Sequence, residues 1–197
     1  MSDPLDEAAD AALRGELIVI PTDTVYGIGT RPDDSSATGR LFAAKARSRT
    51  LALPVLVPTT VIARDLAVFD GRAERLAGAL WPGAVTFVLR RAPASRDWDL
   101  GRDASTIGLR VPHHPMALAV LALTGPLAVT SANRTGQPTP RDCDDLQRAF
   151  GGLVEVYLCA DEPVAGAPSA VVDLTGEEPR IVREGADPAT LARLLGA

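Results

Sequence analysis

The sequence predicts one α/β domain, of the irregular α+β type, in which a mixed parallel and antiparallel sheet carries helices on its faces. The chain has 197 residues, of which 46% are hydrophobic and 23% are charged, so it has enough apolar mass for one core. Short apolar runs, which are typical of strands, intermingle with capped helical segments without a strict strand–helix–strand rhythm. No internal repeat, low-complexity tract or long linker interrupts residues 1–197, which we therefore expect to form a single domain.

Caps and punctuating residues mark the elements expected in the first half of the chain. Gly15 ends the first helix, Asp34 or Ser35 caps the second, and Pro21 ends the first buried strand. A loop dense in hydroxyls and glycines is expected over 21–29. In chain order, the expected elements are a helix over 8–14, a strand over 17–20, a helix from 34 or 35 to about 45, a strand over 53–57, a helix over 72–80 and a strand over 84–90.

The second half of the chain continues in the same way. Gly151 is the expected C-cap of a helix over 142–150, and Asp187 followed by Pro188 opens the last helix as its N-cap and first helical residue. A turn rich in proline and glycine is expected over 134–140. The remaining expected elements are strands over 107–111, 127–130, 153–158, 170–174 and 180–182 and a helix over 116–123.

The charges indicate a site for a compact anion on an acidic molecule. The net charge of −5 argues against a protein that coats nucleic acid through bulk charge. Between Asp34 and Asp65 there is no acidic residue, whereas that stretch includes Arg40, Lys45, Arg47 and Arg49. Lys45 is the single lysine among 20 cations. Two explanations for this single lysine are equally good: chance, or a site that needs a compact ammonium in place of a planar guanidinium.

Cysteine and histidine placement indicates no metal site made by the protein alone. Cys143 and Cys159 do not form a CxxC pair, and the adjacent His113 and His114 would point to opposite sides of an extended segment. Two cysteines make no disulfide framework, so we expect a reducing, cytoplasmic location. The acidic segment 1–10 has no signal-peptide pattern, and no apolar run approaches the roughly 20 residues of a membrane span.

Three polar clusters remain after the common catalytic motifs are excluded. The sequence has no GxxxxGK[ST], GxGxxG, GxSxG or HExxH pattern. The three clusters are Thr22-Asp23-Thr24, Lys45-Ala46-Arg47 and Ser131-Ala132-Asn133. A self-satisfied turn or a helix-terminal charge explains each of them singly. Together, at the ends of elements and without acidic partners nearby, their groups suit a polyphosphate and a small polar molecule.

At this point the residues match a known family in motif order. The matching segments are Pro21-Thr22-Asp23-Thr24-Val25-Tyr26-Gly27, Lys45-x-Arg47, Leu80-Trp81-Pro82-Gly83 with Thr86, Leu109-Arg110-Val111-Pro112 with His114-Pro115, Ser131-Ala132-Asn133, Ser169 in SAVVDLTG, and Pro179-Arg180-Ile181-Val182-Arg183-x-Gly185. Each motif is weak alone, but seven in order are highly specific. The chain resembles the YrdC/Sua5 family, the L-threonylcarbamoyladenylate synthases, in its short single-domain form, with a matching core of about 15–195.

The resemblance implies a fold and a reaction. The fold would be YrdC/RibB-like, a twisted sheet around an open, positively charged cavity. The reaction would join L-threonine, bicarbonate and ATP into threonylcarbamoyl-AMP and pyrophosphate, for the threonylcarbamoylation of adenosine-37 in tRNA. Mg²⁺ would arrive with ATP and take few ligands from the protein. A threonylcarbamoyl transferase complex would use the product, and no membrane partner is implied.

The resemblance also implies roles for individual residues. Thr24, Arg110 and Ser169 would hold L-threonine, with Arg110 clamping its carboxylate. The residues that would hold ATP are Lys45, Arg47, Thr106, Ser131, Asn133, Thr139 and Arg183. Lys45 and Arg47 would also be the catalytic pair, because the reaction needs positioning and charge stabilisation and no protein nucleophile.

The departures from the family pattern leave other functions open. Ala46 and Ser48 stand where KGRP is common, Leu51 removes a polar residue, Ala84 replaces a proline and Pro168 precedes Ser169 where EST is usual. One alternative is a divergent paralogue that adenylates another carbamate. A second is a non-catalytic module for ribosome maturation that binds tRNA or double-stranded RNA weakly. A third is a relative of the carbamoyl-transfer domain of hydrogenase maturation proteins.

Overall fold

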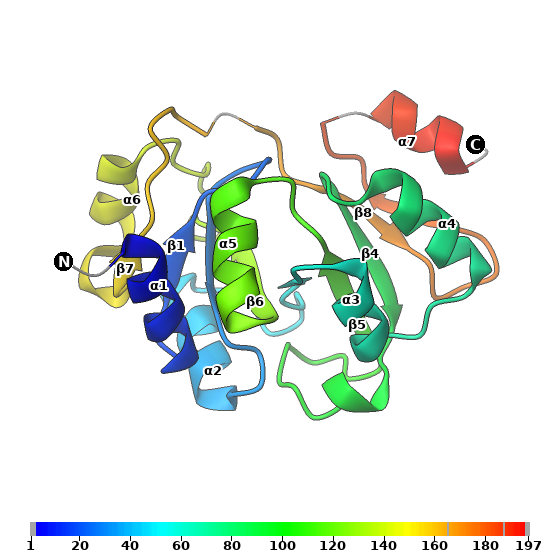
Figure 1. The fold of residues 1–197 in the computed structure, drawn as a ribbon, viewed down its shortest axis with the longest axis horizontal. Helices are drawn as coiled ribbons and strands as arrows, with labels where there is room; N and C mark the ends of the chain where they lie inside the picture. Colours follow the sequence, from blue (N-terminus) through cyan, green and yellow to red (C-terminus); the bar gives the residue numbers. More distant parts are fainter. Residues whose placement is uncertain (1–2, 165, 187, 196–197) are drawn as a thin grey trace.

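The protein folds around one mixed sheet, which confirms the predicted fold class (Figure 1). The computed structural model describes residues 3–164, 166–186 and 188–195. The strands lie in the order β7-β1-β2-β6-β3-β5-β4-β8-β9, and β7–β1, β3–β5 and β4–β8 are the parallel pairs. Their bounds are β1 Ile18–Ile20, β2 Gly27–Thr30, β3 Val55–Leu56, β4 Val85–Arg90, β5 Thr106–Arg110, β6 Leu127–Ser131, β7 Val156–Tyr157, β8 Ala170–Asp173 and β9 Arg180–Arg183.

The helices begin and end close to the caps that the sequence indicates. Asp34 accepts hydrogen bonds from Ser36 N and Ala37 N at the start of α2, and Gly151 ends α6 with a φ of 51°. The α-helices are α1 Pro4–Leu13, α2 Ser35–Ala44, α3 Thr60–Leu66, α4 Gly71–Leu80, α5 Pro115–Thr124, α6 Cys143–Phe150 and α7 Pro188–Leu195, with 3-10 turns η1 Pro93–Ser95 and η2 Gly151–Leu153. The predicted N-cap of the last helix, Asp187, lies outside the described residues.

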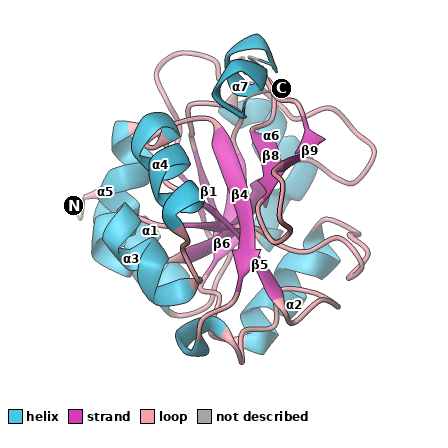
Figure 2. Ribbon diagram, turned by 90° about the vertical axis from the view of Figure 1, so that its right-hand side faces the viewer, coloured by secondary structure: helices cyan, strands magenta, loops and turns pink. Residues whose placement is uncertain are grey.

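Helices cover both sides of the strands but leave the ends of several strands open. Figure 2 shows α1, α3, α4 and α5 on one side of the strands and α2 and α6 on the other. Along β4 and β5, Phe87 and Leu109 are buried in the apolar cluster that also holds Leu76 of α4. Because side chains alternate along a strand, Thr86 and Arg110 point to the opposite side. The polar side chains of β4 and β5 therefore lie on the face of the sheet that α4 does not cover.

Two sequence predictions about the elements are wrong. The segment 21–29 is not a loop throughout, because β2 pairs with β1 and β6 from Gly27 onward. A Cβ on Gly27 would lie 2.5 Å from Val129 Cγ1, so the glycine is needed for a close approach within the sheet. The helix α3, which begins after the capping side chain of Thr59, was not expected at all.

The two cysteines also behave differently from the prediction. Cys143 and Cys159 form a disulfide, with their Cα atoms 5.8 Å apart. The bond joins the start of α6 to the segment that follows β7, which the sequence spacing gave no reason to pair. A backbone hydrogen bond from Val164 N to Arg141 O, 3.0 Å long, connects the same two segments. The segment 159–164 is therefore attached to the chain that leads into α6.

Candidate functional site

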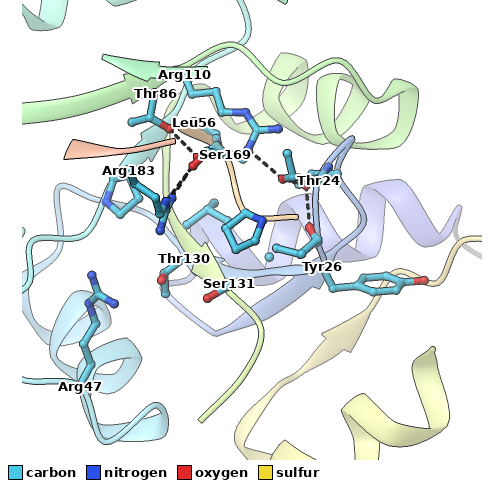
Figure 3. Close-up of a pocket in the computed structure, with 16 residues that line it drawn as sticks. Thr24, Tyr26, Arg47, Leu56, Thr86, Arg110, Thr130, Ser131, Ser169 and Arg183 are labelled. Atoms are coloured by element: carbon cyan, nitrogen blue, oxygen red, sulfur yellow. Dashed lines mark hydrogen bonds between the residues drawn. The ribbon is translucent and has the colours of Figure 1, made fainter. Parts of the chain in front are cut away.

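A pocket lies where the ends of several strands meet, and hydroxyls and guanidinium groups line it (Figure 3). Polar lining residues come from the turn after β1, the segment after α2, β4, β5, β6, and the start of β8 together with the adjacent end of β9. They are Thr22, Thr24, Arg47, Thr86, Arg110, Thr130, Ser131, Ser169 and Arg183. Figure 3 shows Arg47 and Arg183 on one side of the pocket and Thr24 on the other. The described lining residues include no carboxylate.

The turn after β1 presents Thr24 to the pocket. Thr22 Oγ1 donates to Val25 O at 2.6 Å and lies 2.9 Å from Thr24 Oγ1, while Thr24 N donates to Thr22 Oγ1 at 3.2 Å. Both threonines are at least 95% buried. The side chain of Thr22 thus forms hydrogen bonds with backbone groups of its own turn, as in an ST turn. The turn still places the Thr24 hydroxyl at the pocket wall.

Arg110 is buried at the end of β5 and held on three sides. Its Nε donates to Gly83 O at 2.8 Å, its Nη1 to Thr24 Oγ1 at 3.0 Å and its Nη2 to Asp23 Oδ1 at 2.5 Å. Burial lowers the pKa of Arg110, and Asp23 opposes that change. Asp23 also accepts a hydrogen bond from His113 N at 3.0 Å. A guanidinium has five N–H donors, so Arg110 keeps two for a ligand.

Ser169 lies between Thr86 and Arg183 in the pocket wall and contacts both. Ser169 Oγ lies 3.0 Å from Thr86 Oγ1 and accepts from Arg183 Nη2 at 3.2 Å, and Arg183 Nε donates to Ser169 O at 2.8 Å. These bonds hold the guanidinium of β9 against the start of β8. Burial lowers the pKa of Arg183. The predicted threonine ligands Thr24, Arg110 and Ser169 therefore do line one pocket.

Arg47 enters the pocket from an unusual backbone position. Its Nε donates to Leu51 O and its Nη2 to Ala52 O, both at 2.9 Å. Burial lowers the pKa of Arg47, and the positive charge of Arg183 lowers it further. The residue before it, Ala46, has a φ of 49°, which is the left-handed region that favours glycine. Two mutually repelling guanidiniums at one side of a pocket form a site for an anion.

Lys45 does not line the pocket; it supports the segment that does. Its Nζ donates to Ser131 O and Asn133 O at 2.5 Å and to Asn133 Oδ1 at 3.2 Å, and it is 1% exposed. Thr135 donates to Lys45 O through both its N and its Oγ1. Burial lowers the pKa of Lys45 to about 8, with a smaller effect from Arg47. The three oxygens favour the charged form, so the ammonium persists at neutral pH.

The remaining predicted ATP ligands lie apart from the pocket wall. Asn133 sits behind Ser131, whose Oγ donates to Asn133 Oδ1 at 2.6 Å. Thr106 donates to Asp103 Oδ2 at 2.5 Å at the start of β5, on the same side of that strand as Arg110 and roughly 13 Å away by strand rise. Thr139 is half-buried in the segment before α6 and is not a lining residue.

The resemblance assigned no individual role to three residues that help to build the pocket. Thr22 and Asp23 belong to a motif that was singled out, but their importance lies in what they hold, Thr24 and Arg110. Thr86 stands in a motif too, yet its contact to Ser169 joins residues 83 positions apart. The signal that could have identified these three residues is that each stands in a family motif, beside residues to which a role was assigned.

The chain is similar to several known proteins. The family model Sua5_yciO_yrdC, described as telomere recombination, matches residues 10–185. A Mycobacterium tuberculosis protein is 44% identical over 180 residues, which cover 90% of this chain and 82% of its own length. A Stutzerimonas stutzeri protein named threonylcarbamoyl-AMP synthase is 36% identical over 177 residues, covering 88% of this chain and 94% of its own.

A solved structure adds a ligand-bound neighbour. The crystal structure of Pyrococcus abyssi Sua5 complexed with L-threonine superposes with a TM-score of 0.89 at 30% sequence identity. The match covers all of this chain, which spans 59% of that longer chain. The family model covers most of the sequence, and the two relatives named above align over 82% and 94% of their own length. The chain therefore belongs to the Sua5/YciO/YrdC family.

Proposed function

We propose that this protein is an L-threonylcarbamoyladenylate synthase that serves the modification of adenosine-37 in tRNA. The observation that carries the proposal is one pocket with an amino-acid end at Thr24 and Arg110 and an anion end at Arg47 and Arg183. Its relatives are named for this enzyme, and the neighbouring P. abyssi structure contains L-threonine.

The amino-acid end suits a small zwitterion. The two free N–H groups of Arg110 can meet a carboxylate, and Arg110 is held rigidly by Gly83 O and Asp23. Ser169 and Thr86 supply hydroxyls across the pocket for the polar side chain of threonine. Preorganised donors of this kind lose little entropy when the ligand binds.

The anion end suits the phosphates of ATP. Arg47 and Arg183 repel each other when the pocket is empty, and a polyphosphate between them relieves that repulsion. Ser131 adds a hydroxyl beside them, and Lys45 with Asn133 fixes the segment that carries it. Thr106 lies further along the same side of β5, where the nucleoside would extend, and Thr139 would close the site from the segment before α6.

The chemistry follows from these positions. The threonine amine attacks CO2 and loses a proton to form a carbamate. A carbamate oxygen then attacks the α-phosphorus of ATP, the bond to the bridging oxygen breaks, and pyrophosphate leaves with the electron pair. Arg47 and Arg183 would stabilise the charge that develops on the phosphates, and no protein nucleophile takes part.

Magnesium and the later partners complete the proposal. Mg²⁺ would enter with ATP, held by phosphate oxygens. The product would pass to a threonylcarbamoyl transferase complex in the cytoplasm. Among the described helices, none has the length and hydropathy that a bilayer crossing requires.

The direct test measures pyrophosphate release from ATP, Mg²⁺ and bicarbonate, with and without L-threonine. We expect release that depends on threonine, and about a hundredfold loss in Arg110→Lys, which keeps the charge but lacks the planar fork. Release without threonine dependence would contradict the proposal. Binding of structured RNA at physiological salt, with no adenylate formed, would favour the RNA-binding alternative.

A further inference from the structure

The hydroxyl of Thr24 has a defined direction, because its partner Thr22 has a single proton to give. Thr22 Oγ1 lies 2.6 Å from Val25 O, and a carbonyl can only accept, so the Thr22 proton is committed there. The 2.9 Å contact between the two hydroxyls must then use the proton of Thr24. Thr24 Oγ1 accepts from Arg110 Nη1 at 3.0 Å, which occupies one of its two lone pairs.

What Thr24 offers the pocket is therefore one lone pair. Its proton is spent on Thr22, and its second lone pair is the only hydrogen-bonding capacity that it has left. Beside it, Arg110 offers two N–H donors. An acceptor next to paired donors matches a group that carries an N–H next to a carboxylate, which is the layout of an α-amino acid.

The backbone around Thr24 leaves the hydroxyl few alternatives. Gly166 packs directly on Thr24, so closely that a Cβ there would lie 1.9 Å from Thr24 O. Thr24 is 3% exposed, and its own N donates to Thr22 Oγ1. The side chain of Thr24 is thus held by its bonds to Thr22 and Arg110, and the direction of its proton is set by Thr22.

We infer that Thr22 is a positioning residue for substrate recognition. By taking the Thr24 proton, it holds Thr24 Oγ1 as an acceptor for the N–H of the amino-acid substrate, while the carboxylate lies on Arg110. Thr22 itself does not touch the substrate's amino group. The inference rests on the proposed function and specifies which end of the amino acid each residue reads.

The test compares two ligands that differ in the amino group. Equilibrium binding of L-threonine and of 3-hydroxybutanoate, its deamino analogue, is measured for wild type and for Thr22→Val, Thr22→Ser and Thr24→Val. In Thr22→Val the Thr24 proton is released and can turn toward the pocket, so the free lone pair of Thr24 Oγ1 is no longer held facing the substrate. We expect threonine to bind about tenfold more weakly, with the analogue unchanged, because the charge-assisted hydrogen bond to the amino group loses its fixed acceptor. Thr22→Ser keeps the hydroxyl and should bind threonine like wild type.

A double-mutant cycle separates positioning from a general structural role. If Thr22 acts through Thr24, adding Thr22→Val to Thr24→Val should change threonine affinity less than twofold. Equal weakening of both ligands in Thr22→Val, or unchanged threonine binding, would overturn the inference. Should Thr22→Val fail to fold, Thr24→Val decides alone, because unchanged threonine binding there would also overturn it. A wild-type protein that binds no threonine would instead refute the proposed function.

Discussion

Replacing Lys45 with methionine tests whether its ammonium supports the Ser131–Asn133 segment. Methionine keeps most of the aliphatic stem but removes three hydrogen bonds to Ser131 O, Asn133 O and Asn133 Oδ1. Bonds from a charged group contribute about 1.5–3 kcal/mol each, but the variant also escapes the cost of burying an ammonium. Ser131 O keeps its bond from Asn133 N. We therefore expect the free energy of unfolding to fall by about 2–3 kcal/mol.

Urea unfolding followed by circular dichroism measures this change. With a slope of about 2–3 kcal/mol per molar for a chain of this size, the midpoint should fall by about 1 M. Arg14→Met is the matched control, because Arg14 is an exposed cation at the end of α1. It should stay within about 0.5 kcal/mol of wild type. A Lys45→Met protein as stable as that control would refute the supporting role.

Four further predictions concern Lys45, Ala46 and Asp23. As the single lysine, Lys45 labelled with 13Cε should give one resonance that titrates near pH 8, and a midpoint above 10 would contradict its burial. Because the pKa of Lys45 is lower in the folded than in the unfolded chain, its contribution to stability should rise with pH from about 8 to about 10.5, which unfolding curves across that range would show. Ala46→Gly should raise the free energy of unfolding by about 0.5–1 kcal/mol by relieving the positive φ, with glycine's chain entropy subtracted; an unchanged or lower value in urea would argue against strain. Asp23→Asn should lower it by about 1–3 kcal/mol because it breaks the ion pair with Arg110, and a neutral effect in the same assay would show that the pair contributes little.

Local chemistry explains what could be predicted from the sequence. The helix caps at Asp34 and Gly151 depend on the residue itself and its nearest neighbours, so they were located correctly. The glycines of β2 depend on Val129, a hundred residues away, so the strand resembled a loop. The disulfide between Cys143 and Cys159 likewise depends on how α6 and the segment after β7 lie in space.

The residues of the site likewise fall into those that local motifs identify and those that depend on distant contacts. The resemblance grouped Thr24, Arg110 and Ser169, each of which stands in a recognisable motif, and the three do line one pocket. The position of Lys45 could not be anticipated, since its partners are largely backbone carbonyls 86 and 88 positions away, which no side-chain pattern reveals. Its lone occurrence in a chain of arginines now has a physical reason. A compact ammonium carries its three donors on one atom, which fits three oxygens that converge on a single point.

Identifying the reaction product tests the proposed synthase activity most directly. The protein is incubated with 15N-labelled L-threonine, 13C-labelled bicarbonate, ATP and Mg²⁺, and the mixture is followed by NMR. We predict a new 13C resonance that is coupled to both 15N and the α-phosphorus of the adenylate, formed together with pyrophosphate. Pyrophosphate or AMP formation without a carbon that joins threonine nitrogen to phosphorus would contradict the account.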